Sequence, residues 1–320
     1  MIGKSGKVLI VIYIVCLVVL FLMCSTDLII REPEREIYRI AVIIEDVRSD
    51  NYSNFRKGMD QAAAEFNADV QLITLYEKLD AQEQTELMER EQQDGADALI
   101  VVPVEEEQVS QKQMTIPVIL LRAGVAEASG AGNVIVDHEK MGELLARKLL
   151  EEQPAKSPVY VLTDSSGQSD MDRLFLEGIE TVFAEEGRSV QRIMRNEWDR
   201  FFMMLEKMGT EDSQELVILA ENQEILTEAA GVLYGSEDVA EAVGGLYGRG
   251  TTMSILNYLD RGLITGICVT DEFSLGYYSV REAVRALEGA GSVPTVMESY
   301  YIKKEDLRDP AFEKLLFPIE

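Results

Sequence analysis

The chain has 320 residues, of which 47% are hydrophobic and 27% are charged, so it is long enough to form two domains with sizeable cores. Its 57 acidic residues against 30 Lys and Arg give a formal charge of -27, which excludes a protein that reads the phosphate backbone, so no nucleic-acid partner is expected. The sequence has one histidine and no nucleophile motif, metal-ligand cluster or cofactor fingerprint, which argues against an enzyme and against a bound cofactor or metal.

The N-terminal segment predicts a membrane tether. Residues 8–26 carry no charge, and as a helix these 19 residues span about 28 Å, close to the thickness of the hydrocarbon layer of a bilayer. Lys4 and Lys7 precede this run and Asp27 follows it. Because positive charge tends to stay in the cytoplasm, residues 1–7 are expected inside and residues 8–26 across the cell membrane as a single span. Residues 27–38 are then a short charged spacer, and the folded part is extracytoplasmic.

Two other fates of this segment stay open. A cleaved signal peptide usually has an apolar region of about 7 to 15 residues before a small-x-small site, which is not found here. Lipidation of Cys24 would require a small residue before it, where Met23 stands. Cys16 also belongs to the apolar run, so Cys268 is alone in the remainder, and no internal disulfide is expected in the folded part.

Beyond the spacer, short apolar strands alternate with amphipathic helices. The first strands are expected at residues 40–44, 70–75, 98–102 and 116–121, with helices at 52–67 and 82–94. A helix at 140–152 leads to a second run, with strands at 159–163, 189–193, 215–220 and 265–269. Its helices are expected at 171–186, 199–208, 225–234, 252–261 and 275–288, and residues 293–302 are expected to add one more strand. The alternation predicts an α/β fold with two doubly wound parallel-sheet lobes and a ligand site beyond the carboxyl ends of the strands.

An ordered series of segments resembles the type I periplasmic binding proteins of the ribose and galactose class between about residues 40 and 302. The series is IAVIIEDVRSDNYSNFRKGMDQAA, GADALIVVPV, IPVILLRAG, NVIVDHEKMGELLA, DRLFLEGIE, EWDR, LAENQE and GLYG. The resemblance implies an N-terminal lobe formed by residues 39–136 plus 271–292. It implies a C-terminal lobe formed by residues 137–270 plus 293–320. It also implies a small polar ligand, a sugar or related metabolite, between the two lobes.

In the N-terminal lobe the resemblance implies four ligand-binding residues. Tyr52, with Ser49 and Asn51 before it, stands where the family has an aromatic that covers one face of the sugar. Arg122 keeps the Arg of the family's Asp-Arg pair, and an interlobe or surface ion pair is the alternative role for it. Val102 stands where a ligand-binding Asn is common, so the site should be less polar than a ribose site.

In the C-terminal lobe the resemblance implies four more ligand-binding residues. Trp198 stands where an aromatic stacks on the opposite sugar face, with packing at the surface or between the lobes as its alternative. Asn222 matches the Asn of an Asn-Asp pair, although a helix N-cap would also explain it. Tyr247 stands where an Asp is common in the family, with a core role as its alternative. Thr270 stands near a position where a Gln is common in the family. Phe175 stands where an Arg is common in the family.

Two further features are interpreted structurally. The only histidine, His138, falls at a crossover between the lobes. Residues 244–250 (GGLYGRG) match neither a P-loop nor a dinucleotide-binding pattern, so they are interpreted as a turn at a strand end.

These observations favour a membrane-tethered binding protein that closes over its ligand and acts on a membrane partner, either an ABC importer or a sensor kinase. The alternative is a degenerate scaffold of the same fold that acts through protein-protein contacts without a small ligand. A DNA-binding regulator of the related repressor class is excluded, because an apolar span replaces the DNA-binding headpiece.

Overall fold

The structure is a computed structural model that describes residues 4–25, 37–46, 52–122, 133–164, 169–208, 216–291 and 294–318. It divides into two compact units, residues 1–37 and residues 38–320. In the first unit, α1 (Lys4–Ser25) is a helix whose side chains from residue 8 to residue 22 are exposed. Within the described ranges, no helix has both the length and the hydropathy that crossing a membrane requires. Most of the expected spacer lies outside the described residues.

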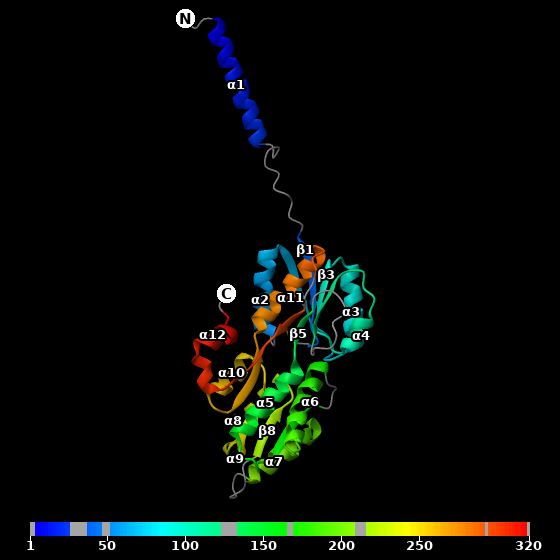
Figure 1. Cartoon of the computed structure of the whole chain (residues 1–320), viewed down its shortest axis with the longest axis vertical. Helices are drawn as coiled ribbons and strands as arrows, with labels where there is room; N and C mark the ends of the chain where they lie inside the picture. Colours follow the sequence, from blue (N-terminus) through cyan, green and yellow to red (C-terminus); the bar gives the residue numbers. More distant parts are fainter. Residues whose placement is uncertain are drawn as a thin grey trace. The chain divides into compact units, whose positions relative to one another are not determined.

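The N-terminal lobe of the second unit is a parallel sheet in the order β11-β5-β4-β3-β1-β2. Helices α2 and α11 cover one face of it and α3 and α4 the other (Figure 1). Both faces are therefore buried, which explains why strands such as β3 are continuous apolar runs. The bounds are β1 (Tyr38–Ile43), α2 (Ser53–Phe66), β2 (Ala68–Ile73), α3 (Ala81–Gln93), β3 (Ala98–Val101), α4 (Glu106–Gln111), β4 (Val118–Arg122), β5 (Val134–Val136), α11 (Glu272–Leu287) and β11 (Thr295–Met297).

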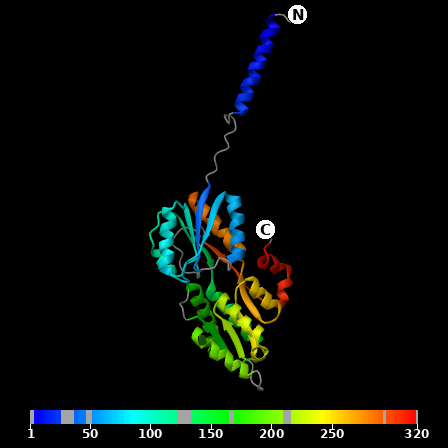
Figure 2. The same ribbon diagram turned by 180° about the vertical axis from the view of Figure 1, so that it is seen from behind.

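The C-terminal lobe repeats this architecture with the order β12-β10-β9-β8-β6-β7, in which only β12 is antiparallel to its neighbour among the described pairs. Helices α5 and α6 pack on one face and α7, α8, α9 and α10 on the other, and Figure 2 shows both lobes from behind. The bounds are α5 (His138–Glu152), β6 (Val159–Thr163), α6 (Asp170–Glu185), β7 (Gln191–Met194), η2 (Arg195–Glu197), α7 (Trp198–Met208), β8 (Leu216–Ala220), α8 (Gln223–Gly235), α9 (Glu237–Ala242), β9 (Val243–Arg249), α10 (Met253–Asp260), β10 (Gly266–Thr270), β12 (Ser299–Ile302), η3 (Lys304–Arg308) and α12 (Pro310–Leu316).

The expectation of one strand at residues 293–302 was wrong in one respect, because the described residues 295–302 contain two strands in different sheets. β11 pairs in parallel with β5 in the N-terminal lobe, whereas β12 pairs antiparallel with β10 in the C-terminal lobe. The chain thus crosses between the lobes at Glu298, and the boundary expected after residue 292 lies further along. The apolar pattern of a strand shows that it is buried, but it does not specify which sheet edge it joins.

The glycine-rich run at 244–250 is also not a turn over most of its length. Residues 243–249 form β9, and only the last glycine, Gly250, has a positive φ, of +126°. Gly248 lies against Leu226, whose side chain would be 3.0 Å from an added Cβ. The glycine there permits close packing of α8 on the sheet, which is why it occurs inside a strand.

In each lobe, one pair of helices crosses at a reciprocal pair of glycines. A Cβ added to Gly142 in α5 would lie 2.0 Å from the carbonyl oxygen of Phe175 in α6, and one added to Gly178 in α6 would lie 2.0 Å from that of Glu139 in α5. The same relation joins Gly58 in α2 to α11 and Gly276 in α11 to α2. The helix backbones therefore touch directly, which only glycine permits.

Candidate ligand-binding site

The carboxyl ends of the strands of both lobes meet at a cavity of about 180 Å³. One buried water needs about 10–15 Å³ of such space, so the cavity has room for on the order of ten non-hydrogen atoms, a small metabolite. This is the edge of an open α/β sheet at which ligands bind. The lining side chains come from both lobes and from the crossovers: Glu45, Asp46, Tyr52, Phe55, Lys78, Leu79, Val102, Leu121, Val136, His138, Met141, Ser169, Met171, Asp172, Asn222, Gln223, Glu224, Arg249, Gly250, Thr251, Cys268, Val269, Thr270, Glu272 and Leu275.

On the side of the N-terminal lobe, carboxyl groups surround a tyrosine. Glu45 lies two residues beyond the end of β1, and the Tyr52 hydroxyl donates a hydrogen bond of 2.6 Å to its Oε2 atom. Burial raises the pKa of Glu45 to about 7, and it likewise raises the pKa of Glu272, at the start of α11, to about 7. Burial, then Glu45, Asp46 and Glu272, raise the pKa of Tyr52 well above its usual value, so this phenol stays a hydrogen-bond donor.

On the side of the C-terminal lobe, Arg249 at the end of β9 organises a buried polar network. Its guanidinium forms an ion pair with Asp172, lies 4.9 Å from the centroid of the Phe175 ring, and donates to the backbone oxygen of Glu221 at 3.3 Å. Its Nη1 atom is 3.0 Å from Nδ1 of His138. Burial and the positive charge of Arg249 lower the pKa of His138, so the ring is neutral and its Nδ1 accepts from Arg249.

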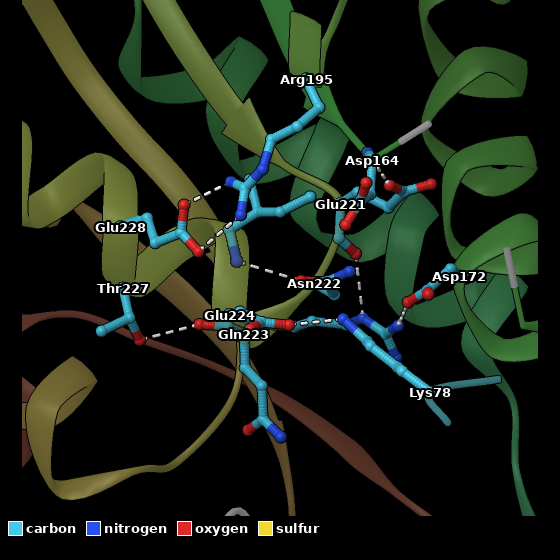
Figure 3. A network of polar contacts seen from close by, with 12 residues as sticks. Lys78, Asp164, Asp172, Arg195, Glu221, Asn222, Gln223, Glu224, Thr227 and Glu228 are labelled. Atoms are coloured by element: carbon cyan, nitrogen blue, oxygen red, sulfur yellow. Dashed lines mark hydrogen bonds and ion pairs between the residues drawn. The ribbon is translucent and has the colours of Figure 1, made fainter. Parts of the chain in front are cut away.

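Direct contacts join the two lobes around the cavity. Lys78, which follows β2, forms an ion pair with Glu224 at the start of α8, as Figure 3 shows. The backbone N of Asp170 donates to the Val104 oxygen at 3.2 Å, and its carboxylate accepts from the backbone N of Glu106 at 2.9 Å. These ion-pair and hydrogen-bond contacts therefore join the two lobes around the cavity.

The C-terminal segment adds a second bridge between the lobes. The η3 and α12 segment packs on the C-terminal lobe through Leu307, Leu315 and Leu316. From there it reaches α2 of the N-terminal lobe, where Asn54 Nδ2 donates to the Leu316 oxygen at 3.3 Å and Lys57 Nζ to the Pro318 oxygen at 3.1 Å.

Three of the eight residues expected at a ligand line this cavity. They are Tyr52, Asn222 and Thr270. Asn222 also caps α8, because its Oδ1 accepts from the backbone N of Ile225 at 3.0 Å, so the cap uses one acceptor position of this side chain. Thr270 is 7% exposed, and its Oγ1 has no hydrogen-bond partner among the described residues. Ser49 and Asn51 lie outside the described residues, as does the side chain of Arg122.

The structure places Trp198 away from the cavity. It begins α7 and is 7% exposed in the core between that helix and the sheet, with its Nε1 donating to the Ile193 oxygen at 3.2 Å and its ring against Phe202 and the Arg195 guanidinium. The expected stacking role was therefore wrong in this structure. The spacing of Trp198, Phe201, Phe202 and Leu205 is the apolar stripe of a core-facing helix, a signal that the sequence already contained.

Replacing Trp198 with Phe is expected to lower the free energy of unfolding by about 1–3 kcal/mol, because it removes buried surface and the hydrogen bond to Ile193. Urea denaturation measures this, and Tyr76→Phe is the control, because Tyr76 is 86% exposed. Equal unfolding midpoints for both variants would contradict the buried position of Trp198.

Tyr247 also lies away from the cavity. It is fully buried against α5, where its hydroxyl accepts from Gln153 Nε2 at 2.8 Å and donates to Glu152 Oε2 at 3.2 Å. Arg249 is two residues further along the same strand, about 7 Å at roughly 3.3 Å per residue, and reaches the cavity instead. Along this strand, the residue that lines the cavity is therefore Arg249 and not Tyr247.

Sequence reasoning missed the charged residues of the described lining. They include Glu45, Lys78, Asp172, Arg249 and Glu272. Glu45 and Glu272 were detectable in part, because each is a carboxylate within two residues of the end of a buried strand. Nothing in the sequence placed Asp172 against Arg249, since the two are separated by 77 positions.

Two parallel-sheet lobes joined by three crossing segments, with a cavity at the carboxyl ends of their strands, define the two-lobed type I binding-protein architecture expected from the sequence. A sequence model described as the periplasmic binding protein domain matches residues 40–291, and the chain belongs to that family. The family prediction is therefore confirmed.

Solved structures with the same fold share little sequence with the chain. A carbohydrate transporter solute-binding protein from Agrobacterium radiobacter, in complex with D-arabinose, has a TM-score of 0.75 at 16% identity and covers 88% of this chain and 99% of its own. An ABC transporter solute-binding protein from Bacillus halodurans C-125, with bound myo-inositol, has a TM-score of 0.69 at 18% identity and covers 87% and 98%. A glucose-galactose binding protein from Geobacillus stearothermophilus has a TM-score of 0.69 at 19% identity and covers 85% and 99%. No curated protein matches the sequence.

Proposed function

We propose that the chain is an extracytoplasmic solute-binding protein that closes its two lobes over a small polar ligand, a sugar or a related metabolite. One observation carries this proposal: the cavity at the carboxyl ends of both sheets combines an apolar wall with a few polar groups, and one of these, Thr270 Oγ1, is buried without a partner. A buried hydroxyl without a partner is unfavourable, so it favours a ligand that hydrogen-bonds to it.

The chemistry of the lining supports a ligand rich in hydroxyl groups. Tyr52, Asn222 and Thr270 supply hydrogen-bonding groups, while Phe55 and Met171 offer apolar surface for the C–H faces of a ring. The related structures bound to D-arabinose and myo-inositol are consistent with this class. We include Ser49, Asn51 and Arg122 in the proposed site on the sequence resemblance alone.

The strand order of the two sheets supports a proposal for the lobe boundaries. We propose an N-terminal lobe of residues 39–136 plus 271–297 and a C-terminal lobe of residues 137–270 plus 299–320, with three crossing segments as the hinge.

The membrane tether remains a proposal from the sequence. Its support is the uncharged run of residues 8–26 and the lysines before it. A tethered cleft stays beside one membrane partner, either an ABC importer that receives the ligand or a sensor kinase that reads closure of the lobes.

The replacement of Thr270 with Val tests the ligand site, because two effects of opposite sign are expected. Without ligand, the variant should be as stable as the wild type or up to about 1 kcal/mol more stable, since a buried hydroxyl without a partner is removed. With ligand, affinity should fall about two- to tenfold, because one hydrogen bond is worth about 0.5–1.5 kcal/mol.

The measurement is thermal unfolding of the full chain in detergent against a panel of pentoses, hexoses, inositols and small metabolites. A ligand at 100 times its Kd stabilises by about 2.7 kcal/mol, which gives a clear shift. Tyr76→Phe is again the control. If nothing in a broad panel shifts the wild type, the protein is better described as a scaffold that acts through protein-protein contacts.

A further inference from the structure

The charges around the cavity do not balance among the described residues. The two described cations of the lining, Lys78 and Arg249, are each in an ion pair, with Glu224 and Asp172 respectively. Two other carboxyl groups of the lining, Glu45 and Glu272, have hydroxyl groups as their hydrogen-bond partners, Tyr52 and Thr251 respectively. No described cation lies within ion-pair distance of either.

These two carboxyl groups converge on one place. Glu45 follows β1 and Glu272 follows β10, yet both line the same cavity as Tyr52, and the charge of each raises the pKa of the Tyr52 phenol. Thr270, two residues before Glu272, adds an independent indication, because its buried Oγ1 atom has no described partner in the same cavity. The cavity therefore presents two carboxylates and a donor or acceptor hydroxyl to one small ligand.

We propose that the ligand carries a protonated amine as well as hydroxyl groups, as a small amino sugar or amino polyol does, and that Glu45 and Glu272 bind the ammonium. This rests on the proposed function, since it names the ligand class for the same cavity. A buried carboxylate is unfavourable unless a cation or hydrogen-bond donors compensate it, and an ammonium supplies both. A neutral sugar supplies only donors, and an anionic sugar acid or sugar phosphate is repelled.

The proposal implies a pH dependence with a definite sign. The pKa of each carboxyl group lies near 7 because of burial, with Tyr52, Asp46 and Asp172 facing Glu45, and Thr251 and Asp271 facing Glu272. An ammonium binds the ionised form, so affinity should be highest above pH 7 and fall as the pH drops. Between pH 8 and pH 6 the expected loss is about tenfold for each carboxyl group that must ionise. A neutral sugar should not show this loss.

The test is isothermal titration calorimetry on the full chain in detergent at pH 8. Each neutral pentose, hexose, inositol and sugar alcohol is compared with its primary-amine analogue, for example sorbitol with glucamine, and with the N-acetylated analogue, which has similar size but no charge. The amine is expected to bind at least tenfold more tightly than both comparators. Glu45→Gln and Glu272→Gln should each remove most of this preference and reduce the pH dependence, whereas Glu139→Gln, at an exposed position, should change neither.

Both Gln variants are expected to fold, because Gln has the shape of Glu and each substitution removes a buried charge. Equal or weaker binding of the amine relative to its neutral parent would overturn the amine proposal and leave the proposed function intact. An amine preference that survives both Gln variants would overturn the roles of Glu45 and Glu272. If no member of the panel binds, the amine proposal and the proposed function both fail.

Discussion

Replacing Gly178 with Ala is expected to lower the free energy of unfolding by about 3 kcal/mol or more. The added Cβ would lie 2.0 Å from the Glu139 oxygen and 3.0 Å from the backbone N of Glu143 in α5, so the two helices must move apart. Both helices carry the core of the C-terminal lobe, including Leu145, Ile179 and Phe183, which would lose contacts as the helices separate. Overpacking of a rigid core typically costs about 1–3 kcal/mol, and clashes with backbone atoms fall at the upper end.

The matched control is Gly231→Ala, which also places an alanine inside a helix. The nearest described atom to its added Cβ is the Tyr258 hydroxyl, at 3.7 Å, so no clash arises. Because alanine is a better helix former than glycine, this variant should gain up to about 1 kcal/mol. Urea denaturation compares the two, and similar effects of the two substitutions would contradict direct backbone contact between α5 and α6.

Replacing Arg249 with Met is expected to lower the free energy of unfolding by about 3–5 kcal/mol. Asp172, which is only 7% exposed, would then lose the guanidinium that pairs with it. His138 would lose its hydrogen-bond donor. A buried charge without its partner accounts for a loss of this size, and the methylene stem of Met keeps most of the packing on Phe175.

The double variant Arg249→Met with Asp172→Asn separates this cause from lost packing. Once the negative charge is gone, Arg249→Met should cost about 1–2 kcal/mol, so the two substitutions should show a coupling of at least about 1 kcal/mol in a double-mutant cycle. Strictly additive effects on the unfolding midpoint would show that the pair does not interact as the geometry indicates. Ligand affinity should fall in the single variant as well, because Arg249 lines the cavity.

Much of the fold was predictable because burial on both sides of a sheet leaves a local signature. The strand expected at residues 159–163 coincides with β6, and the one expected at 98–102 differs from β3 by one residue. β3 is apolar throughout and β6 nearly so, as is expected of strands covered on both faces. Residues 293–302 were harder, because the same apolar pattern is compatible with a single strand and with two strands in different sheets.

The candidate site was predictable only where a residue's position along the chain also decides its environment. Thr270 and Asn222 stand at strand ends, and the structure brings both to the cavity. Trp198 follows a strand end too, but β7 is the edge strand of its sheet, and the helix stripe turns the ring into the core. Tyr247 was misplaced because a shift of two residues along β9 keeps the side chain on the same face but moves it away from the strand end.

The sequence by itself determined the repeated strand-helix pattern, and with it the two-lobed architecture and the family, because the spacing of apolar residues encodes which elements are buried. The charge of the cavity was decided only by the tertiary structure. Lys78 meets Glu224 and Arg249 meets Asp172 across 146 and 77 positions of the chain, and these pairings leave neither of the two described lining cations for Glu45 and Glu272. The ionisation of a carboxyl group depends on what packs around it, and for these residues the neighbours come from segments that only folding brings together.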